Sequence, residues 1–184
     1  MRWPREALDA FRQLATPRNA VAAAVAVPLI GLAVLRFGLG GRFAVAAFVI
    51  ATLSLLAVID VTDRRIPNRI VLPAAGVVLA AQIALAPDRT LEWILAAAAS
   101  ALVLLLPLLV SPSGVGMGDV KLMLLLGAAL GSAVATALII GSLAAAAYAG
   151  LLLVRNGAAA RRMAFPLGPF LAIGGVFALL LQGA

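Results

Sequence analysis

The sequence predicts an all-α protein, a polytopic membrane helix bundle with seven spans. Three observations lead to this fold class. Of the 184 residues, 65% are hydrophobic and only 11% are charged, whereas a soluble domain is about 45–50% apolar and ~25% charged. The apolar residues form uncharged runs of about the 20 residues that a bilayer-spanning helix needs. Most of the Lys and Arg residues lie in the short connections between those runs.

The longest apolar run has to be divided into two spans. Residues 122–154 carry no charge, and one straight helix of that run would measure ~50 Å against a hydrocarbon core of ~30 Å. We therefore expect a break near residues 131–132, with the earlier helix starting around Gly116. The seven predicted spans are residues 19–35, 43–59, 70–86, 93–110, 116–131, 132–154 and 166–181.

The N-terminal segment differs from the rest of the chain. Trp3, Ala7, Phe11 and Leu14 recur at helical spacing among charged residues, which predicts an interfacial amphipathic helix over residues 1–18. Residues 19–42 then form an extra N-terminal span and loop, and residues 43–184 form the membrane-embedded core. A cleaved signal peptide is the alternative for residues 19–35, but the charged region ahead of it is long and further spans follow at once.

The distribution of Lys and Arg predicts the orientation of the bundle. With the N-terminus in the cytoplasm, 11 of these residues lie on the cytoplasmic side and 3 on the opposite side, as the positive-inside rule requires. The net charge of +7 does not indicate nucleic-acid binding, because the basic residues are scattered between apolar runs. The absence of Cys and His excludes thiol nucleophiles, Ser-His-Asp triads and His-ligated or Cys-ligated metals.

Two carboxylates at membrane depth are the main candidates for chemistry, because ionisable groups there are costly and are functional by default. Asp60 follows the span 43–59, and Asp119 opens the span 116–131, at the same predicted face of the membrane. Helix packing could therefore bring them together. Two carboxylates a few ångströms apart do not both ionise easily, so one keeps its proton while the other acts as a base. Such a pair can activate water for attack on a peptide carbonyl.

Structural interpretations of the same residues stay open. Asp60 could cap a helix or pair with Arg64 or Arg65, and Asp63 lies among arginines in a loop, where a surface ion pair is the simpler role. Lys121 could extend its charge to lipid phosphates or bias the local potential. For Asp119, an N-cap role would explain the aspartate but not the two glycines, Gly116 and Gly118, that precede it.

Three segments, in order, resemble the signature of the type IV prepilin peptidases, the GxGD-type intramembrane aspartyl proteases. They are Asp60 with Ile66-Pro67-Asn68, then Gly116-Met117-Gly118-Asp119-Val120-Lys121-Leu122, then Pro166-Leu167-Gly168-Pro169-Phe170-Leu171-Ala172. The resemblance covers residues from about 43 to the C-terminus and implies a six-helix peptidase core, with one extra span before it.

The resemblance also implies an activity and a set of site residues. Asp60 and Asp119 match the first Asp of the Asp-x5-Ile/Leu-Pro-Asp/Asn motif and the Asp of Gly-x-Gly-Asp, which implies that they are the catalytic pair. The implied reaction is cleavage of the basic leader peptide of prepilins or pseudopilins at the cytoplasmic membrane face. The expected supporting or substrate-binding residues are Gly116, Gly118, Lys121, Pro67 and Asn68.

The resemblance further implies the setting in which the protein works. Bifunctional members of the family also N-methylate the new N-terminus and carry paired Cys-x-x-Cys motifs, but this sequence has no cysteine. We therefore expect the short, peptidase-only subgroup that serves Tad/Flp-type pili or related secretion systems. The expected location is the bacterial or archaeal cytoplasmic membrane, as a multi-pass protein. The expected partners are prepilins or pseudopilins and the lipid bilayer, with no cofactor, metal or nucleic acid and no particular oligomeric state.

Two functions of other classes remain as alternatives. A transporter or channel would use Asp60 and Asp119 as a proton or cation relay, but it predicts paired broken helices, and only the Gly-rich stretch at residues 114–118 is an obvious break. A non-catalytic assembly factor would hold pilin helices in Ala- and Gly-rich grooves. It would tolerate the replacement of both aspartates by asparagine.

Overall fold

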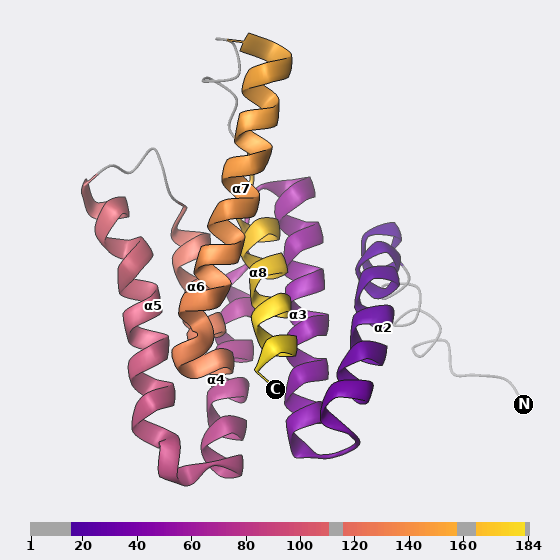
Figure 1. The fold of residues 1–184 in the computed structure, drawn as a ribbon, viewed down its shortest axis with the longest axis vertical. Coiled ribbons are helices and arrows are strands. Elements are labelled where there is room, and N and C mark those ends of the chain that lie inside the picture. The colour runs from indigo at the N-terminus through magenta and orange to yellow at the C-terminus, as the bar shows by residue number, and fades with distance from the viewer. Residues whose placement is uncertain (1–15, 111–115, 158–164, 183–184) are drawn as a thin grey trace, which may run out of the picture.

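The computed structural model describes residues 16–110, 116–157 and 165–182. Within these ranges the chain forms seven α-helices and two short 3-10 turns and contains no strand (Figure 1). The helices and turns are α2 (Pro17–Phe37), α3 (Gly41–Asp63), α4 (Asn68–Leu85), η1 (Pro87–Arg89), α5 (Thr90–Val110), α6 (Met117–Leu130), η2 (Gly131–Ala133), α7 (Val134–Asn156) and α8 (Gly168–Leu181).

The predicted fold class is confirmed. Each of the seven predicted spans coincides with one helix, and five stretches are long and apolar enough to cross a membrane, the longest being Met117–Asn156, which contains α6, η2 and α7. The chain is thus a multi-pass helical membrane protein. The predicted interfacial helix falls almost wholly outside the described residues, which begin at Thr16, the N-cap of α2. The division of the chain at residues 18 and 42 stays a prediction.

The predicted break in the long apolar run is present. α6 ends at Leu130 and α7 begins at Val134, and Gly131 between them has a φ of 57°, a left-handed conformation that glycine adopts without a steric penalty. A Cβ at Gly131 would also lie 2.7 Å from the ring of Trp93. Both the backbone angle and the contact with Trp93 therefore require glycine at this turn.

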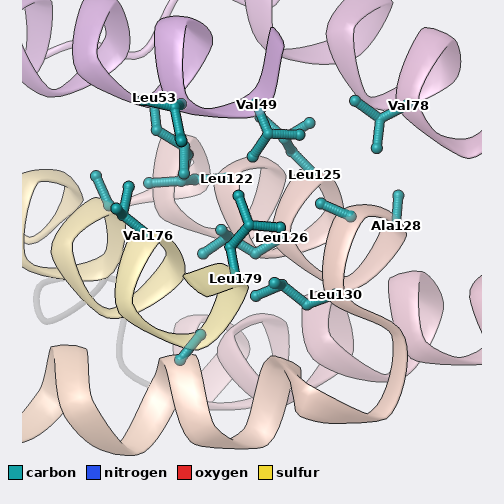
Figure 2. Close-up of a cluster of buried hydrophobic side chains, with 14 of the residues drawn as sticks. Val49, Leu53, Val78, Leu122, Leu125, Leu126, Ala128, Leu130, Val176 and Leu179 are labelled. Atoms are coloured by element: carbon teal, nitrogen blue, oxygen red, sulfur yellow. The ribbon is translucent and has the colours of Figure 1, made fainter. Parts of the chain in front are cut away.

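α6 and α8 form the centre of the bundle. Ten of the 14 residues of α6 and eight of the 14 residues of α8 are buried. α6 packs against α4 and α5, whereas α8 packs against α3 and α7. Figure 2 shows the resulting core, in which side chains such as Leu53 of α3, Leu126 of α6 and Val176 of α8 meet. α2 lies at one edge of the bundle and packs mainly on α3 (Figure 1).

Glycines allow the closest helix contacts in this core. A Cβ at Gly127 would collide with the carbonyl oxygen of Ala96, and one at Gly174 would collide with that of Ala137. Small residues at such crossings let helix backbones approach closely, which is how helices pack in a solvent without a hydrophobic effect. The α5–α6 and α7–α8 pairs are therefore held by backbone proximity.

The two central helices are short. α6 and α8 have 14 residues each, whereas α3 and α7 have 23 each. At a rise of 1.5 Å per residue, 14 residues span about 21 Å, less than a hydrocarbon core of ~30 Å. α7 extends well past the start of α8 (Figure 1). The N-terminal end of α6 and the residues just ahead of α8 contribute to the cavity described next.

Candidate active site

Asp60 lies in the last turn of α3 and is held by the start of α8. Its side chain is 7% exposed, and Oδ2 accepts a hydrogen bond of 3.1 Å from the backbone N–H of Gly168. Helix α3 ends because Arg64 adopts a left-handed conformation (φ 50°), with its N–H bonded to the carbonyl of Asp60. The predicted alternative, an ion pair with a neighbouring arginine, is not found among the described residues.

Asp119 lies in the first turn of α6. It is 9% exposed, and its Oδ2 accepts a hydrogen bond of 3.3 Å from the backbone N–H of Gly116. A carboxylate at this position is stabilised by the free N–H groups and the positive end of the helix dipole. A Cβ at Gly116 would lie 3.3 Å from the same carboxylate oxygen, so a larger residue there would crowd Asp119.

Both aspartates line one cavity of about 1540 Å³. Its walls come from the end of α3, the connection to α4, the start of α6 and residues 165–167 ahead of α8. All seven residues singled out from the sequence line this cavity, although they come from segments about 50 residues apart: Asp60, Pro67, Asn68, Gly116, Gly118, Asp119 and Lys121. Hence the structure brings the predicted site residues together in one place.

Two of the sequence motifs contact each other directly. A Cβ at Gly118 would lie 3.0 Å from the Cβ of Ile66, so the glycine lets α6 rest on the connection between α3 and α4. Lys121 Nζ donates a hydrogen bond of 2.7 Å to Oδ1 of Asn68. Pro67 is the N-cap of α4 in an extended conformation, and its carbonyl accepts from the first turn of that helix. These contacts link the segments that carry the two aspartates.

Asp63 has a partner that the sequence did not indicate. It forms an exposed ion pair of 3.1 Å with Arg18, at the start of α2. The expected surface role is thus found, but the partner comes from a helix 45 residues away rather than from the adjacent arginines. Exposed pairs of this kind contribute about 0–1 kcal/mol to stability.

Sequence analysis missed the role of Gly168. The motif containing it was recognised, but no contact was assigned to it. A Cβ at Gly168 would lie 2.6 Å from Oδ2 of Asp60. The available signal was a glycine before a proline at the predicted start of a helix, a position at which free backbone N–H groups occur.

An aromatic cluster, also missed, supports the segment before α8. The rings of Tyr148, Phe165 and Phe170 lie with centroids 5.4–5.8 Å apart, at separations favourable for aromatic pairs. Tyr148 belongs to α7 and Phe170 to α8, whereas Phe165 lines the cavity. The cluster therefore ties the cavity wall to two helices.

The donor set of the cavity favours acid–base chemistry by carboxylates. No group of three or more His, Cys, Asp or Glu side chains that could hold a metal ion occurs in the described parts of the chain. Two buried carboxylates beside a cavity large enough for water and peptide can accept and return protons at a reacting centre. The basic residues Arg64, Arg65 and Arg69 also line the cavity.

The fold and site define a multi-pass helical membrane protein with two buried carboxylates in one cavity. Residues 47–150 match the family model described as the type IV leader peptidase family, and the chain belongs to that family. It is 32% identical over 152 residues to the prepilin leader peptidase/N-methyltransferase of Bacillus subtilis (strain 168). This alignment covers 83% of the chain and 61% of the relative, so the chain spans about three fifths of that protein's length. No solved structure matches the chain.

Proposed function

We propose that this protein is a prepilin leader peptidase, an intramembrane aspartyl endopeptidase. The observation that carries the proposal is the presence of Asp60 and Asp119, from two different helices, in one cavity. Membership of the type IV leader peptidase family and the name of the B. subtilis relative support the same activity. The proposed substrates are prepilins or pseudopilins, and the proposed reaction is hydrolysis of the bond that joins leader and mature protein.

In the proposed mechanism the two aspartates share one proton. The ionised carboxylate removes a proton from a water molecule, which attacks the scissile carbonyl carbon and forms a tetrahedral intermediate. The other carboxyl then gives its proton to the leaving amine nitrogen, and the peptide bond breaks. Because Gly168 and Gly116 each donate a backbone hydrogen bond to one carboxylate, both side chains are oriented before substrate arrives.

The supporting residues have separate proposed roles. Gly116 and Gly118 leave room beside Asp119 and Ile66, so that an extended peptide can approach the N-terminal turn of α6. Pro67 holds the connection between α3 and α4 in one conformation. The hydrogen bond between Lys121 and Asn68 keeps that connection against α6. We propose that these residues position the pair and the substrate rather than exchange protons.

Cleavage is proposed to take place at the cytoplasmic face of the cytoplasmic membrane of a bacterium or archaeon. The Lys and Arg asymmetry of 11 to 3 supports a cytoplasmic N-terminus. In that orientation the end of α3 with Asp60 and the start of α6 with Asp119 lie on the cytoplasmic side. We propose the peptidase activity alone for this chain, because the sequence has no cysteine with which to form the paired Cys-x-x-Cys motifs of bifunctional members.

Co-expression with a prepilin tests the proposal. The protein and a candidate prepilin from the same genome are produced together in a host that lacks other leader peptidases. Mass spectrometry of the pilin should show loss of the leader, and the loss should disappear when Asp60 or Asp119 is replaced by asparagine. Unprocessed pilin with the unaltered protein, for every pilin tried, would contradict the proposal and favour a proton or cation relay.

A further inference from the structure

A second cavity lies at the end of the bundle opposite the two aspartates. Its volume is about 430 Å³, within the range of ~300–1000 Å³ that is usual for small-molecule sites. It is lined from the α2–α3 turn, the α4–α5 turn, η2 and the end of α8, and it shares no residue with the first cavity. Figure 1 shows these two turns together at the lower end of the bundle. It is therefore separate from the cavity of the proposed hydrolysis.

Three arginines line this cavity, and two of them lack a carboxylate partner among the described residues. Arg89 makes two hydrogen bonds of 2.8 Å to Glu92 and lies over the ring of Trp93, 4.7 Å from its centroid. The side chain of Arg36 donates only to the backbone carbonyl of Leu180, and the side chain of Arg42 has neither a hydrogen bond nor an ion pair within the described ranges. The cavity thus carries an excess of positive charge.

The other walls of the cavity are partly polar, from Gln82, Ser132 and Gln182, and partly apolar. Phe37, Val45 and Leu179 supply apolar surface. Trp93 is 5% exposed, and its Nε1 is buried with no acceptor among the described residues. A ligand with an anionic head and apolar chains fits this combination better than a free ion does.

We propose that this cavity binds the phosphodiester headgroup of an anionic phospholipid. Arg36 and Arg42 bind the phosphate oxygens, because a guanidinium presents paired N–H groups that match phosphate geometry. The acyl chains run along the apolar wall and the neighbouring helices. The bound lipid joins α2 to α3 and α8 at the end of the bundle where no catalytic residue is proposed.

Quenching of Trp93 fluorescence tests the proposal. The chain contains two tryptophans, so Trp3→Phe leaves Trp93 as the single reporter in the full-length protein in neutral detergent. Brominated phosphatidylglycerol should quench Trp93 saturably, and the double variant Arg36→Gln/Arg42→Gln should need about tenfold more lipid for half-quenching, since charged hydrogen bonds are lost. Arg42→Gln alone disturbs no described contact and should show a smaller shift in the same direction.

Four controls decide the outcome. Arg155→Gln, exposed at the other end of α7, should leave the quenching curve unchanged, and Arg36→Lys/Arg42→Lys should keep most of the affinity because it keeps the charge. Equal quenching by brominated phosphatidylcholine, or an unchanged curve in the glutamine variants, would overturn the proposal. Displacement of the brominated lipid by millimolar inorganic phosphate would also overturn it, and would assign the site to a free anion.

Discussion

The backbone N–H of Gly168 donates a hydrogen bond of 3.1 Å to Oδ2 of Asp60, across 108 residues of sequence. Because Gly168 is the first residue of α8, its N–H has no partner within the helix and is available to the carboxylate. The contact also depends on the missing side chain, since a Cβ would lie 2.6 Å from that oxygen. Asp60 is thus oriented by the first residue of α8, a helix that begins within the third motif.

Gly168→Ala should impair cleavage without unfolding the protein. The added methyl group forces Asp60 or the start of α8 to move, and a displacement of about 1 Å at a reacting group can cost ~100-fold in rate. The measurement is leader cleavage rate in detergent at equal protein concentration. Gly150→Ala is the matched control, because a Cβ there meets nothing within 4 Å. Equal activity of the two variants would contradict the proposed role of Gly168 in positioning Asp60.

Asp60→Asn and Asp119→Asn should each abolish cleavage while the protein still accumulates in the membrane. An amide can neither act as the base nor return the proton, and acid–base catalysis contributes about 10²–10⁴-fold in rate. Pilin processing is measured by mass spectrometry and protein level by immunoblot. Asp63→Asn is the control and should retain most activity, because its ion pair with Arg18 is exposed. A fully active single variant of either candidate would exclude the proposed pair.

Gly118→Val should lower cleavage more than it lowers protein level. The valine side chain would press on Ile66, whose Cβ would lie only 3.0 Å from the new Cβ, and would shift the α3–α4 connection at the cavity wall. Gly76→Val, at an exposed position of α4 where a Cβ meets nothing within 4 Å, is the matched control. If cleavage and protein level fell in parallel, Gly118 would have a folding role only.

Lys121 and Asn68 should behave as a coupled pair. Lys121→Met and Asn68→Ala each remove the hydrogen bond of 2.7 Å and should each reduce kcat/KM severalfold. The double variant should be little worse than either single one, because residues in direct contact give non-additive effects. A double-mutant cycle on kcat/KM measures the coupling. Full additivity would mean that the two side chains act independently, for example if Lys121 served lipid phosphates alone.

Single cysteines should report the proposed orientation. The chain has no native cysteine, so Arg65→Cys, Arg155→Cys and Asp88→Cys each give one labelling site at an exposed position. A membrane-impermeant maleimide on intact cells should label position 88 and spare positions 65 and 155, as the charge asymmetry predicts. Lysed cells provide the control for reactivity. Labelling of positions 65 and 155 from outside would invert the bundle and exclude cytoplasmic cleavage.

The helices could be predicted from the sequence because the bilayer, unlike water, cannot satisfy free backbone polar groups. In a bilayer, every backbone polar group must be satisfied within its segment, so long apolar runs form helices, and the seven expected spans follow from this. Several helix boundaries differ from the predicted ones: α3 ends at Asp63 rather than at residue 59, and α5 begins at Thr90 rather than at residue 93. The carboxylate of Glu92 is neutralised by Arg89 and accepts from Ser132, so this charge is tolerated within the first turn of α5.

Contacts between segments that are far apart in the sequence were harder to predict. Asp60 and Asp119 could be placed at one face of the membrane because that needs only span counting. The hydrogen-bond partners of the site residues could not be predicted in this way. Asp63 pairs with Arg18, Lys121 with Asn68, and Asp60 with Gly168, across 45, 53 and 108 residues of sequence. These pairings depend on which helix packs beside which, and apolar periodicity carries little of that information when nearly every face is apolar.

The shortness of α6 and α8 has a consequence for how water reaches a bond inside a membrane. Helices of about 21 Å are shorter than a hydrocarbon layer of ~30 Å, which amounts to a hydrophobic mismatch. The cavity of about 1540 Å³ lies at the N-terminal end of α6 and beside the residues just ahead of α8. The proposed hydrolysis consumes one water molecule per turnover, and we expect this recess to supply that water from the end of the bundle. In this proposal a substrate helix would need to unwind only at its end, while its apolar body stays in the bilayer.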